Sequence, residues 1–261
     1  MECLSFLHHN THDGFLPLSA HFEAMKRFAC SFREIESLAL NNGITPLRYK
    51  RNQKTITHTD QHTLFNATVL ILGCGGLGGF VSELLCRIGV GNLILIDGDV
   101  FEEHNLNRQN FSTIHTLGKP KAHVLKDALE VINPALHVKA FELFFDLSLH
   151  ADLLESADVV VDALDNPELK CLIASWCKEH NKAFVHGAIA GYAAQFATSK
   201  TLEHLYHEKG KGAEIVVGNP SFTASFAASI QSAEVIKLLL QKPHLETFLF
   251  ADLWAYEFNV L

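Results

Sequence analysis

The feature that most constrains the fold is a glycine-rich turn between an apolar run and a helical pattern. Residues 67–72 read Ala-Thr-Val-Leu-Ile-Leu, and Gly-Cys-Gly-Gly-Leu-Gly follows at once at 73–78. The next apolar run, at 92–96, ends at Asp97. A strand, a glycine turn, a helix and a second strand closed by an acid make up a nucleotide-binding βαβ unit.

The alternation of apolar runs and helical patterns continues beyond this unit. The predicted strands are short and apolar throughout, as strands buried on both faces of a parallel sheet are. Strands are expected at 67–72, 92–97, 136–142, 157–161 and 183–186, and helices at 77–89, 119–132, 148–155 and 167–180. After Gly187 we expect strands at 192–199, 248–252 and 254–260, a long helix at 221–240, and a crossover loop at 200–218.

This pattern predicts an α/β fold with a doubly wound, Rossmann-like, mostly parallel sheet, C-terminal antiparallel strands and an N-terminal helical extension. The extension covers residues 1–46, and residues 47–261 form the main domain. One helix is expected from Pro17 to Asn41, ended by Asn-Asn-Gly. Its apolar stripe needs cover from the main domain or from a partner subunit. Residues 45–66 are polar and are expected to form an irregular or short helical connector.

Composition limits the partners of the chain. Its 21 basic and 29 acidic residues give a formal charge of −8, which argues against nucleic acid and anionic membranes as ligands. No apolar run reaches the roughly 18 residues of a membrane span, and the start lacks a signal-peptide pattern. The six cysteines form no CxxC pair, which is typical of free thiols in a reducing compartment. We therefore expect a cytoplasmic protein without a zinc site.

Each glycine of the turn has a separate expected role. Gly73 permits the tight turn, Gly75 and Gly76 let the backbone approach a phosphate, and Gly78 allows close packing of helix and strand. The first turn of the following helix then offers free N–H groups and a positive dipole to an anion. The alternative is a glycine-rich turn that binds nothing.

Three acids follow strand ends. Asp97 is placed to accept hydrogen bonds from both ribose hydroxyls, and Asp99 is available but less well placed. Asp165 comes between a strand end and a helix start, where open α/β sheets bind ligands, and it is the expected magnesium ligand beside a triphosphate. Asn166 is best explained as the helix cap, although it also adjoins the nucleotide site. Asp162, at the strand end itself, is the more structural of the pair.

Cations follow the second strand of the unit. Nucleotidyl transfer consists mostly of positioning and charge stabilisation, so it needs fixed cations around the reacting phosphate. Arg108 can grip two phosphate oxygens and Lys121 acts as a point charge. Asn105 and Gln109 add neutral donors. Any one of these groups alone can be a solvated surface residue, but four in one short stretch indicate a shared role.

Together these motifs resemble the ThiF/MoeB/HesA family, the bacterial relatives of ubiquitin-activating enzymes. The resemblance covers about residues 48 to 260 and depends on GCGGLG, DGD with NLNRQ, GKPK and DALDN in order. It implies ATP-dependent adenylation, by an adenylyltransferase, of the C-terminal glycine of a small ubiquitin-like sulfur carrier of the MoaD or ThiS kind. Such carriers serve molybdopterin or thiamin biosynthesis.

The resemblance also implies residue roles. Gly75 and Gly76 contact the nucleotide and Asp97 holds the ribose. The phosphates are contacted by Asn105, Arg108 and Lys121, and Asp165 is the acid near magnesium. In the family, the second arginine of an RYxRQ segment reaches the triphosphate of the neighbouring subunit. That segment reads Arg-Tyr-Lys-Arg-Asn-Gln here, so the resemblance nominates Arg51 and implies a homodimer.

Two departures from the family pattern bear on the chemistry. Many members bind a structural zinc through two CxxC pairs, and this chain has none. Members that carry the substrate covalently use a cysteine on the crossover loop, and residues 200–218 contain none. Cys171 and Cys177 fall on the buried face of the helix at 167–180 and are expected to be structural. Adenylation is therefore expected without covalent carriage.

Three alternatives stay open at this point. The adenylated carboxylate can belong to a peptide or a tRNA-linked group instead of a sulfur carrier. The glycine motif and Asp97 alone also fit a nicotinamide-dependent oxidoreductase. The third alternative is a nucleotide sensor without catalysis.

Overall fold

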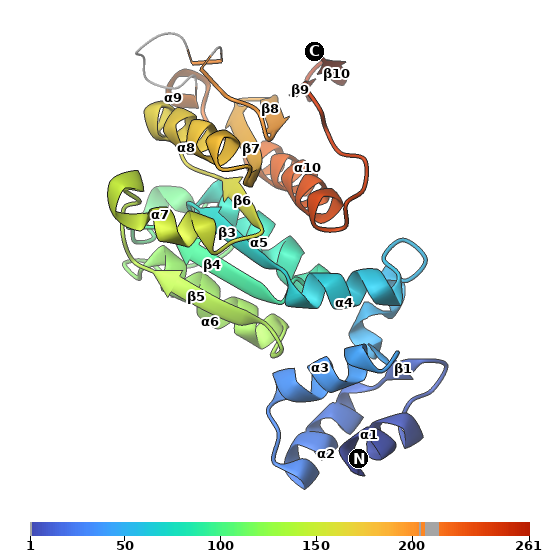
Figure 1. Cartoon of the computed structure of the whole chain (residues 1–261). Helices are drawn as coiled ribbons and strands as arrows, with labels where there is room; N and C mark the ends of the chain where they lie inside the picture. Colours follow the sequence, from blue (N-terminus) through green and yellow to red (C-terminus); the bar gives the residue numbers. More distant parts are fainter. Residues whose placement is uncertain (1, 204, 207–213) are drawn as a thin grey trace.

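The protein is built around one large, mostly parallel β-sheet. The computed structural model describes residues 2–203, 205–206 and 214–261, and within them eight strands run in the order β10-β9-β8-β7-β6-β3-β4-β5 (Figure 1). Strands β7, β6, β3, β4 and β5 are mutually parallel, and β8, β9 and β10 are antiparallel. The bounds are β3 Thr68–Leu72, β4 Asn92–Ile96, β5 His137–Phe141, β6 Val159–Asp162, β7 Ala183–Ala190, β8 Ala193–Thr198, β9 Phe248–Asp252 and β10 Glu257–Val260.

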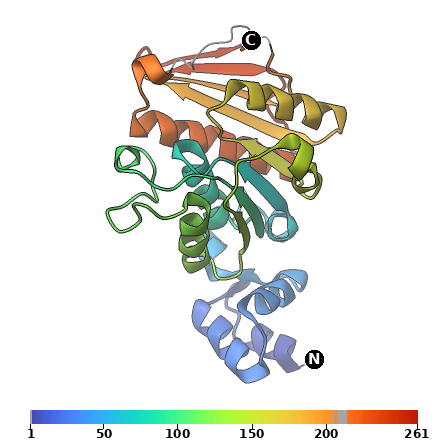
Figure 2. The same ribbon diagram turned by 90° about the vertical axis from the view of Figure 1, so that its left-hand side faces the viewer.

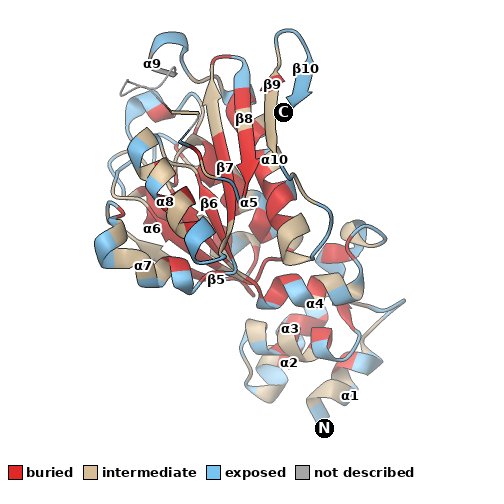
Figure 3. Cartoon of the chain, turned by 45° about the horizontal axis from the view of Figure 1, so that its top comes forward, coloured by how far each residue is buried: buried red, intermediate tan, exposed pale blue. Residues whose placement is uncertain are grey.

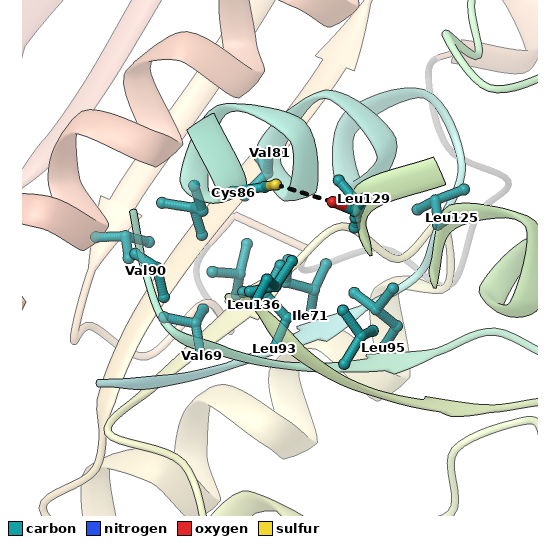
Figure 4. Close-up of a cluster of buried hydrophobic side chains, with 14 of the residues drawn as sticks. Val69, Ile71, Val81, Cys86, Val90, Leu93, Leu95, Leu125, Leu129 and Leu136 are labelled. Carbon is teal, nitrogen blue, oxygen red and sulfur yellow. Dashed lines mark hydrogen bonds between the residues drawn. The ribbon is translucent and has the colours of Figure 1, made fainter. Parts of the chain in front are cut away.

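Helices cover both faces of this sheet, which confirms the predicted doubly wound fold. Alternate residues of β3 and β4, such as Val69 and Leu93, pack against Val81 and Leu85 of α5 and Leu125 of α6 (Figure 4). Helix α10 belongs to this same cluster. The helices on this face are α5 Gly76–Ile88, α6 Lys121–Ile132 and α10 Ser221–Leu239.

The other face of the sheet buries the alternate side chains. Leu70 and Ile94 point to this face and pack with Leu154 of α7 (Leu147–Glu155) and Ile173 of α8 (Pro167–Glu179). Figure 3 shows the central strands buried and β10 exposed along its length. The period-two alternation of apolar side chains thus fills two layers, and the strand ends are left to form a site.

The C-terminal part adds the predicted antiparallel strands, with one difference. β7 was expected to end at 186, but it continues through Gly187 to Ala190 and pairs with β8. Gly187 lets the end of the Gln231 side chain of α10 lie close to β7, because a Cβ there would lie 2.4 Å from Gln231 Cδ and would displace that side chain. The crossover expected at 200–218 lies partly outside the described residues. Its described part contains the short helix α9 (Glu214–Val217).

The N-terminal extension is a separate helical layer at the far end of the molecule (Figures 1 and 2). The prediction of a single helix from Pro17 to Asn41 is wrong: α2 (Leu18–Phe28) ends at Ala29, whose φ is 52°, and α3 (Phe32–Asn41) begins anew. A capping box between Ser31 and Glu34 starts α3. A further helix, α1 (Glu2–His9), and two short paired strands, β1 (Phe15–Leu16) and β2 (Thr45–Pro46), complete the layer.

The apolar stripe of the extension is covered within this chain. Leu7, Ala24 and Ile35 pack together between α1, α2 and α3. Phe32 and Leu40 pack against Phe65 and Ala135 of the main domain. Most of the stripe is therefore buried by this chain itself, which is one of the two expected covers, while Phe22 stays 53% exposed.

The connector is more regular than expected. It contains a 3₁₀ helix, η1 (Leu47–Asn52), and the helix α4 (His58–Asn66). A second capping box, between Thr57 and Asp60, starts α4. A further 3₁₀ turn, η2 (Glu103–Asn105), follows β4.

Candidate active site at the carboxyl edge of the sheet

A single large cavity collects most of the predicted residues. It has a volume of about 860 Å³, near the upper end of the roughly 300–1,000 Å³ usual for ligand sites. Its walls come from the segments that follow β3, β4, β5 and β6. The chain runs from β3 outward through β4 to β5 on one side and then crosses over to β6 on the other side of β3, which makes this the switch point where open α/β sheets bind ligands.

The glycine turn fits tightly against the neighbouring strand end. Gly73 has a φ of +92°, and a Cβ there would lie 2.6 Å from the carbonyl oxygen of Ala163. A Cβ on Gly78 would lie 1.8 Å from the carbonyl oxygen of Gly73, so helix α5 and the turn touch backbone to backbone. Gly75 and Gly76 line the cavity at the start of α5, with free N–H groups of the first helical turn nearby.

Asp97 is held in place by the backbone. Its carboxylate accepts hydrogen bonds from the amide of Cys74 at 2.7 Å and from the amide of Asp99 at 2.8 Å. Burial raises the pKa of Asp97, and the nearby Lys121 acts in the opposite direction. The carboxylate therefore sits at the junction of the glycine turn and β4 with capacity left for further donors.

Lys121 and Asp99 form an ion pair at the cavity wall. The distance from Lys121 Nζ to Asp99 Oδ2 is 3.0 Å, and the lysine is almost fully buried at the start of α6 while the aspartate side chain is 55% exposed. Asp99 thus orients the lysine instead of lying apart from it. Both residues line the cavity.

Arg108 is held by the loop that contains it. Its Nη1 donates to the carbonyl oxygen of His104 at 3.2 Å and to Asn107 Oδ1 at 2.9 Å. Asn105 is buried, and its Oδ1 accepts from the amide of Glu102 at 2.9 Å. Gln109 is also buried, and its Oε1 has no hydrogen-bond partner among the described residues. Arg108, Asn105 and Gln109 all line the cavity.

Asp165 lines the cavity from the opposite side, beyond the end of β6, and its side chain is exposed. An exposed carboxylate at a phosphate site fits magnesium, which typically takes one or two carboxylates together with phosphate and water. Asn166 does not line the cavity. Its Oδ1 accepts from the amide of Leu169 at 3.0 Å, so it caps α8 as the sequence predicts.

A buried charged cluster supports the floor of the cavity, and sequence reasoning missed two of its members. Asp162 accepts from Lys170 Nζ at 3.0 Å and from His186 Nδ1 at 2.6 Å, and all three side chains are buried. Although burial opposes the charged form, Lys170 and His186 keep the pKa of Asp162 below its ordinary value. Lys170 also donates to the carbonyl oxygen of Gly187 at 3.2 Å, which joins α8 to β7.

The half of the cavity beyond this cluster has a different lining. Its walls come from β7 and β8, from Leu205 and Tyr206, and from Asn219. Among the lining residues from 187 onward that the structure describes, none is charged. The cavity therefore has a charged half beside the glycine turn, lined by both cations and carboxylates, and an uncharged half beside β7.

Arg51 is the one predicted catalytic residue that lies away from the cavity. It belongs to η1, whose Tyr49 packs beside Gly89 and accepts a hydrogen bond from Asn133 Nδ2 at 3.0 Å. Gly89 precedes β4, so η1 lies at the amino edge of the sheet, opposite Asp97. Arg51 is exposed there and is not brought to the site of its own chain.

The cysteines lie away from the reacting region or inside the core. Cys74, Cys86 and Cys177 are buried, and Cys171 is partly buried on α8. Burial raises the pKa of Cys177 to about 12, which suits an inert thiol. Among the described residues there is no cluster of three or more metal-binding side chains and no helix long and apolar enough to cross a membrane.

The fold and the cavity define a class of protein: a doubly wound α/β domain that has, at its switch point, fixed cations and a glycine-rich turn of the kind that binds phosphates. The chain belongs to the ThiF family, because the sequence model of this family matches residues 49–261. The resemblance stated from the motifs is thereby confirmed, and the chain has adenylyltransferase homologues.

Individual relatives differ in how much of them the chain covers. It is 36% identical over 119 residues to the tRNA threonylcarbamoyladenosine dehydratase of Bacillus subtilis; this match covers 45% of the chain and 47% of the relative, so the chain spans about half of its length. It is 29% identical to the molybdopterin-synthase adenylyltransferase of Haemophilus influenzae, over 75% of this chain and 84% of the relative. The crystal structure of E. coli MccB with ATP shares the fold with a TM-score of 0.73 at 23% identity, covering 92% of this chain and 82% of MccB.

Proposed function

We propose that this chain is an ATP-dependent adenylyltransferase that activates the C-terminal glycine carboxylate of a small ubiquitin-like sulfur carrier. The observation that carries the proposal is the shared cavity. The glycine turn, Asp97, Lys121 and Arg108 line its charged half, Asp165 faces them, and an uncharged half adjoins. A nucleoside triphosphate with its metal ion suits the first half and a neutral peptide tail suits the second.

In the proposed reaction a carboxylate oxygen of the carrier attacks the α-phosphorus of ATP. The bond between the α-phosphorus and the bridging oxygen breaks, and pyrophosphate leaves with that electron pair. Asp97 binds the ribose, while Arg108 and Lys121 offset the charge that develops on the phosphate oxygens. Asp165 would hold magnesium, which would supply further charge neutralisation at the phosphates.

The partner subunit enters the proposal through Arg51. Its place at the amino edge of the sheet leaves it far from its own cavity, so a contribution to catalysis requires a second copy of the chain. A guanidinium from outside suits this chemistry because its planar fork can bridge phosphate oxygens. We therefore propose that the active enzyme is a homodimer. We also propose that it is cytoplasmic and that it needs no zinc.

A second candidate substrate is a tRNA-linked carboxylate. The identity to the B. subtilis dehydratase, 36%, favours it, whereas the formal charge of −8 disfavours RNA binding. The nicotinamide-dependent oxidoreductase and the nucleotide sensor have weaker support, because the chain belongs to the ThiF family and has adenylyltransferase homologues.

ATP–pyrophosphate exchange separates these functions. Exchange that depends on a diglycine-ended carrier supports the proposal, whereas exchange that depends on tRNA supports the second candidate. Binding of ATP without exchange in any mixture indicates a sensor. Calorimetry that finds tighter binding of NAD than of ATP would refute adenylation altogether.

A further inference from the structure

Asn219 lies where the two halves of the cavity meet. Its backbone carbonyl accepts a hydrogen bond from Asn107 Nδ2 at 3.2 Å, and Asn107 Oδ1 in turn accepts from Arg108 Nη1 at 2.9 Å. The phosphate-binding arginine and Asn219 are thus joined through one side chain. Both Arg108 and Asn219 line the cavity.

The side-chain amide of Asn219 is unused within the chain. Its Oδ1 is buried without a hydrogen-bond partner, and no described residue bonds to its Nδ2. Buried polar atoms in native proteins are nearly always paired, so an unpaired one beside a cavity points to a ligand. The last bond of an asparagine side chain rotates over a broad range, which lets the oxygen turn toward a donor that enters.

The group that pairs with Asn219 Oδ1 must carry a hydrogen-bond donor, and beside Arg108 the ligand expected is a phosphate with the acyl group that attacks it. Phosphate oxygens of ATP only accept hydrogen bonds from amides, so they leave an amide oxygen unpaired. A peptide group offers both an N–H and a carbonyl oxygen, which match the two ends of a side-chain amide. The uncharged walls contributed by Gly187, Ala188 and Ala194 suit a neutral extended chain and offer no cation to an RNA backbone.

We propose that Asn219 binds the last peptide group of the acyl substrate, accepting its N–H, and so places the terminal carboxylate beside the phosphate held by Arg108. This inference rests on the proposed function and assigns recognition of the last peptide bond of its substrate to one residue. Asn219 is then a substrate-binding residue that selects a peptide tail over other carboxylates.

A coupled substitution of enzyme and substrate tests the hydrogen bond. The substrates are a diglycine-ended carrier and a semisynthetic copy whose last peptide N–H is replaced by an ester oxygen. In pyrophosphate exchange the wild-type enzyme should lose about tenfold in kcat/KM on the ester, the worth of one hydrogen bond. Asn219→Ala should start lower, lose nothing more on the ester, and keep the wild-type KM for ATP.

Ser221→Ala is the matched control, because Ser221 is exposed in the same segment and does not line the cavity. It should lose as much on the ester as the wild type does. Equal losses in wild type and Asn219→Ala, or no loss in the wild type, overturn the inference while adenylation stands. If no diglycine-ended carrier supports pyrophosphate exchange by the wild-type enzyme, the proposed function is overturned and this inference with it.

Discussion

Lys121→Met separates the catalytic from the structural importance of the buried lysine. Methionine keeps most of the apolar stem and removes the charge. The only ion-pair partner of Lys121 among the described residues is Asp99, whose side chain is 55% exposed and stays hydrated without the lysine. Loss of such a half-exposed pair is expected to cost about 1 kcal/mol of unfolding free energy or less. Loss of one preorganised charge at a reacting phosphate costs about 10²–10³ in kcat, or about 2.7–4 kcal/mol.

The assay is carrier-dependent pyrophosphate exchange, measured alongside the denaturant midpoint of each variant. Lys126→Met is the control, because Lys126 lies on the same helix, pairs with Glu130 at 4.0 Å and does not line the cavity. It should keep wild-type exchange. Lys121→Met retaining more than a tenth of the wild-type rate contradicts the catalytic role, as does a loss of rate that tracks a loss of folded protein.

Three further predictions follow from the site. Because burial raises the pKa of Asp97, ATP affinity measured by calorimetry should begin to fall, as the pH is lowered, at a higher pH than that at which an ordinary aspartate titrates. In the same pH window the ionisation of Asp97 lowers folding stability as the pH rises. The variant Asp97→Asn should flatten both pH profiles. The double variant Cys171→Ala, Cys177→Ala should keep adenylate formation, with no stoichiometric zinc by elemental analysis; a folded but inactive double variant would show that a thiol participates. Arg51→Ala and Asp165→Ala homodimers should each be nearly inactive, and mixing them should restore activity at the one site with both residues intact; mixed dimers without activity would place Arg51 outside the reaction.

The central sheet was predictable because strands that are buried on both faces appear in the sequence as short, continuous apolar runs. Apolar runs such as 68–72 and 92–96 alternate with helical patterns, and the bounds of β3 and β4 lie within one residue of their predicted positions. β7, in contrast, runs four residues beyond its predicted end. The order of chain segments then put Asp97 and the glycine turn at one edge by topology alone. Arg108 and Lys121 lie close together because the loop after β4 returns along that edge.

The helix starts that depend on side-chain capping were not predicted from the spacing of apolar residues. Apolar spacing runs through 17–41 without a break, but Ser31 and Glu34 start a new helix by pairing with each other's backbone groups. The same motif at Thr57 and Asp60 starts α4 inside a stretch that apolar spacing leaves blank. Ser-x-x-Glu and Thr-x-x-Asp are readable signals, and they outweigh the hydrophobic pattern at helix starts.

Long-range polar contacts were beyond prediction from one sequence. Lys170 resembles any helical surface lysine, yet it is buried against Asp162 because α8 packs over the ends of β6 and β7. His186 and Asn219 likewise acquire their roles from strands and loops far away in the chain. Only the assembled sheet brings these groups to one cavity.

The docking of the N-terminal extension has a consequence for how freely its sequence can change. Arg33 of α3 donates to the main-chain carbonyl oxygens of Gly91 and Ala135 at 2.7 Å each, and to that of Phe65 at 3.4 Å. It also donates to Asn92 Oδ1 at 3.0 Å. Main-chain oxygens are present whatever side chain a position carries, so mutation on the main-domain side of this joint can rarely abolish it. For these three hydrogen bonds to main-chain oxygens, the sequence requirement therefore falls on the arginine and not on its partners.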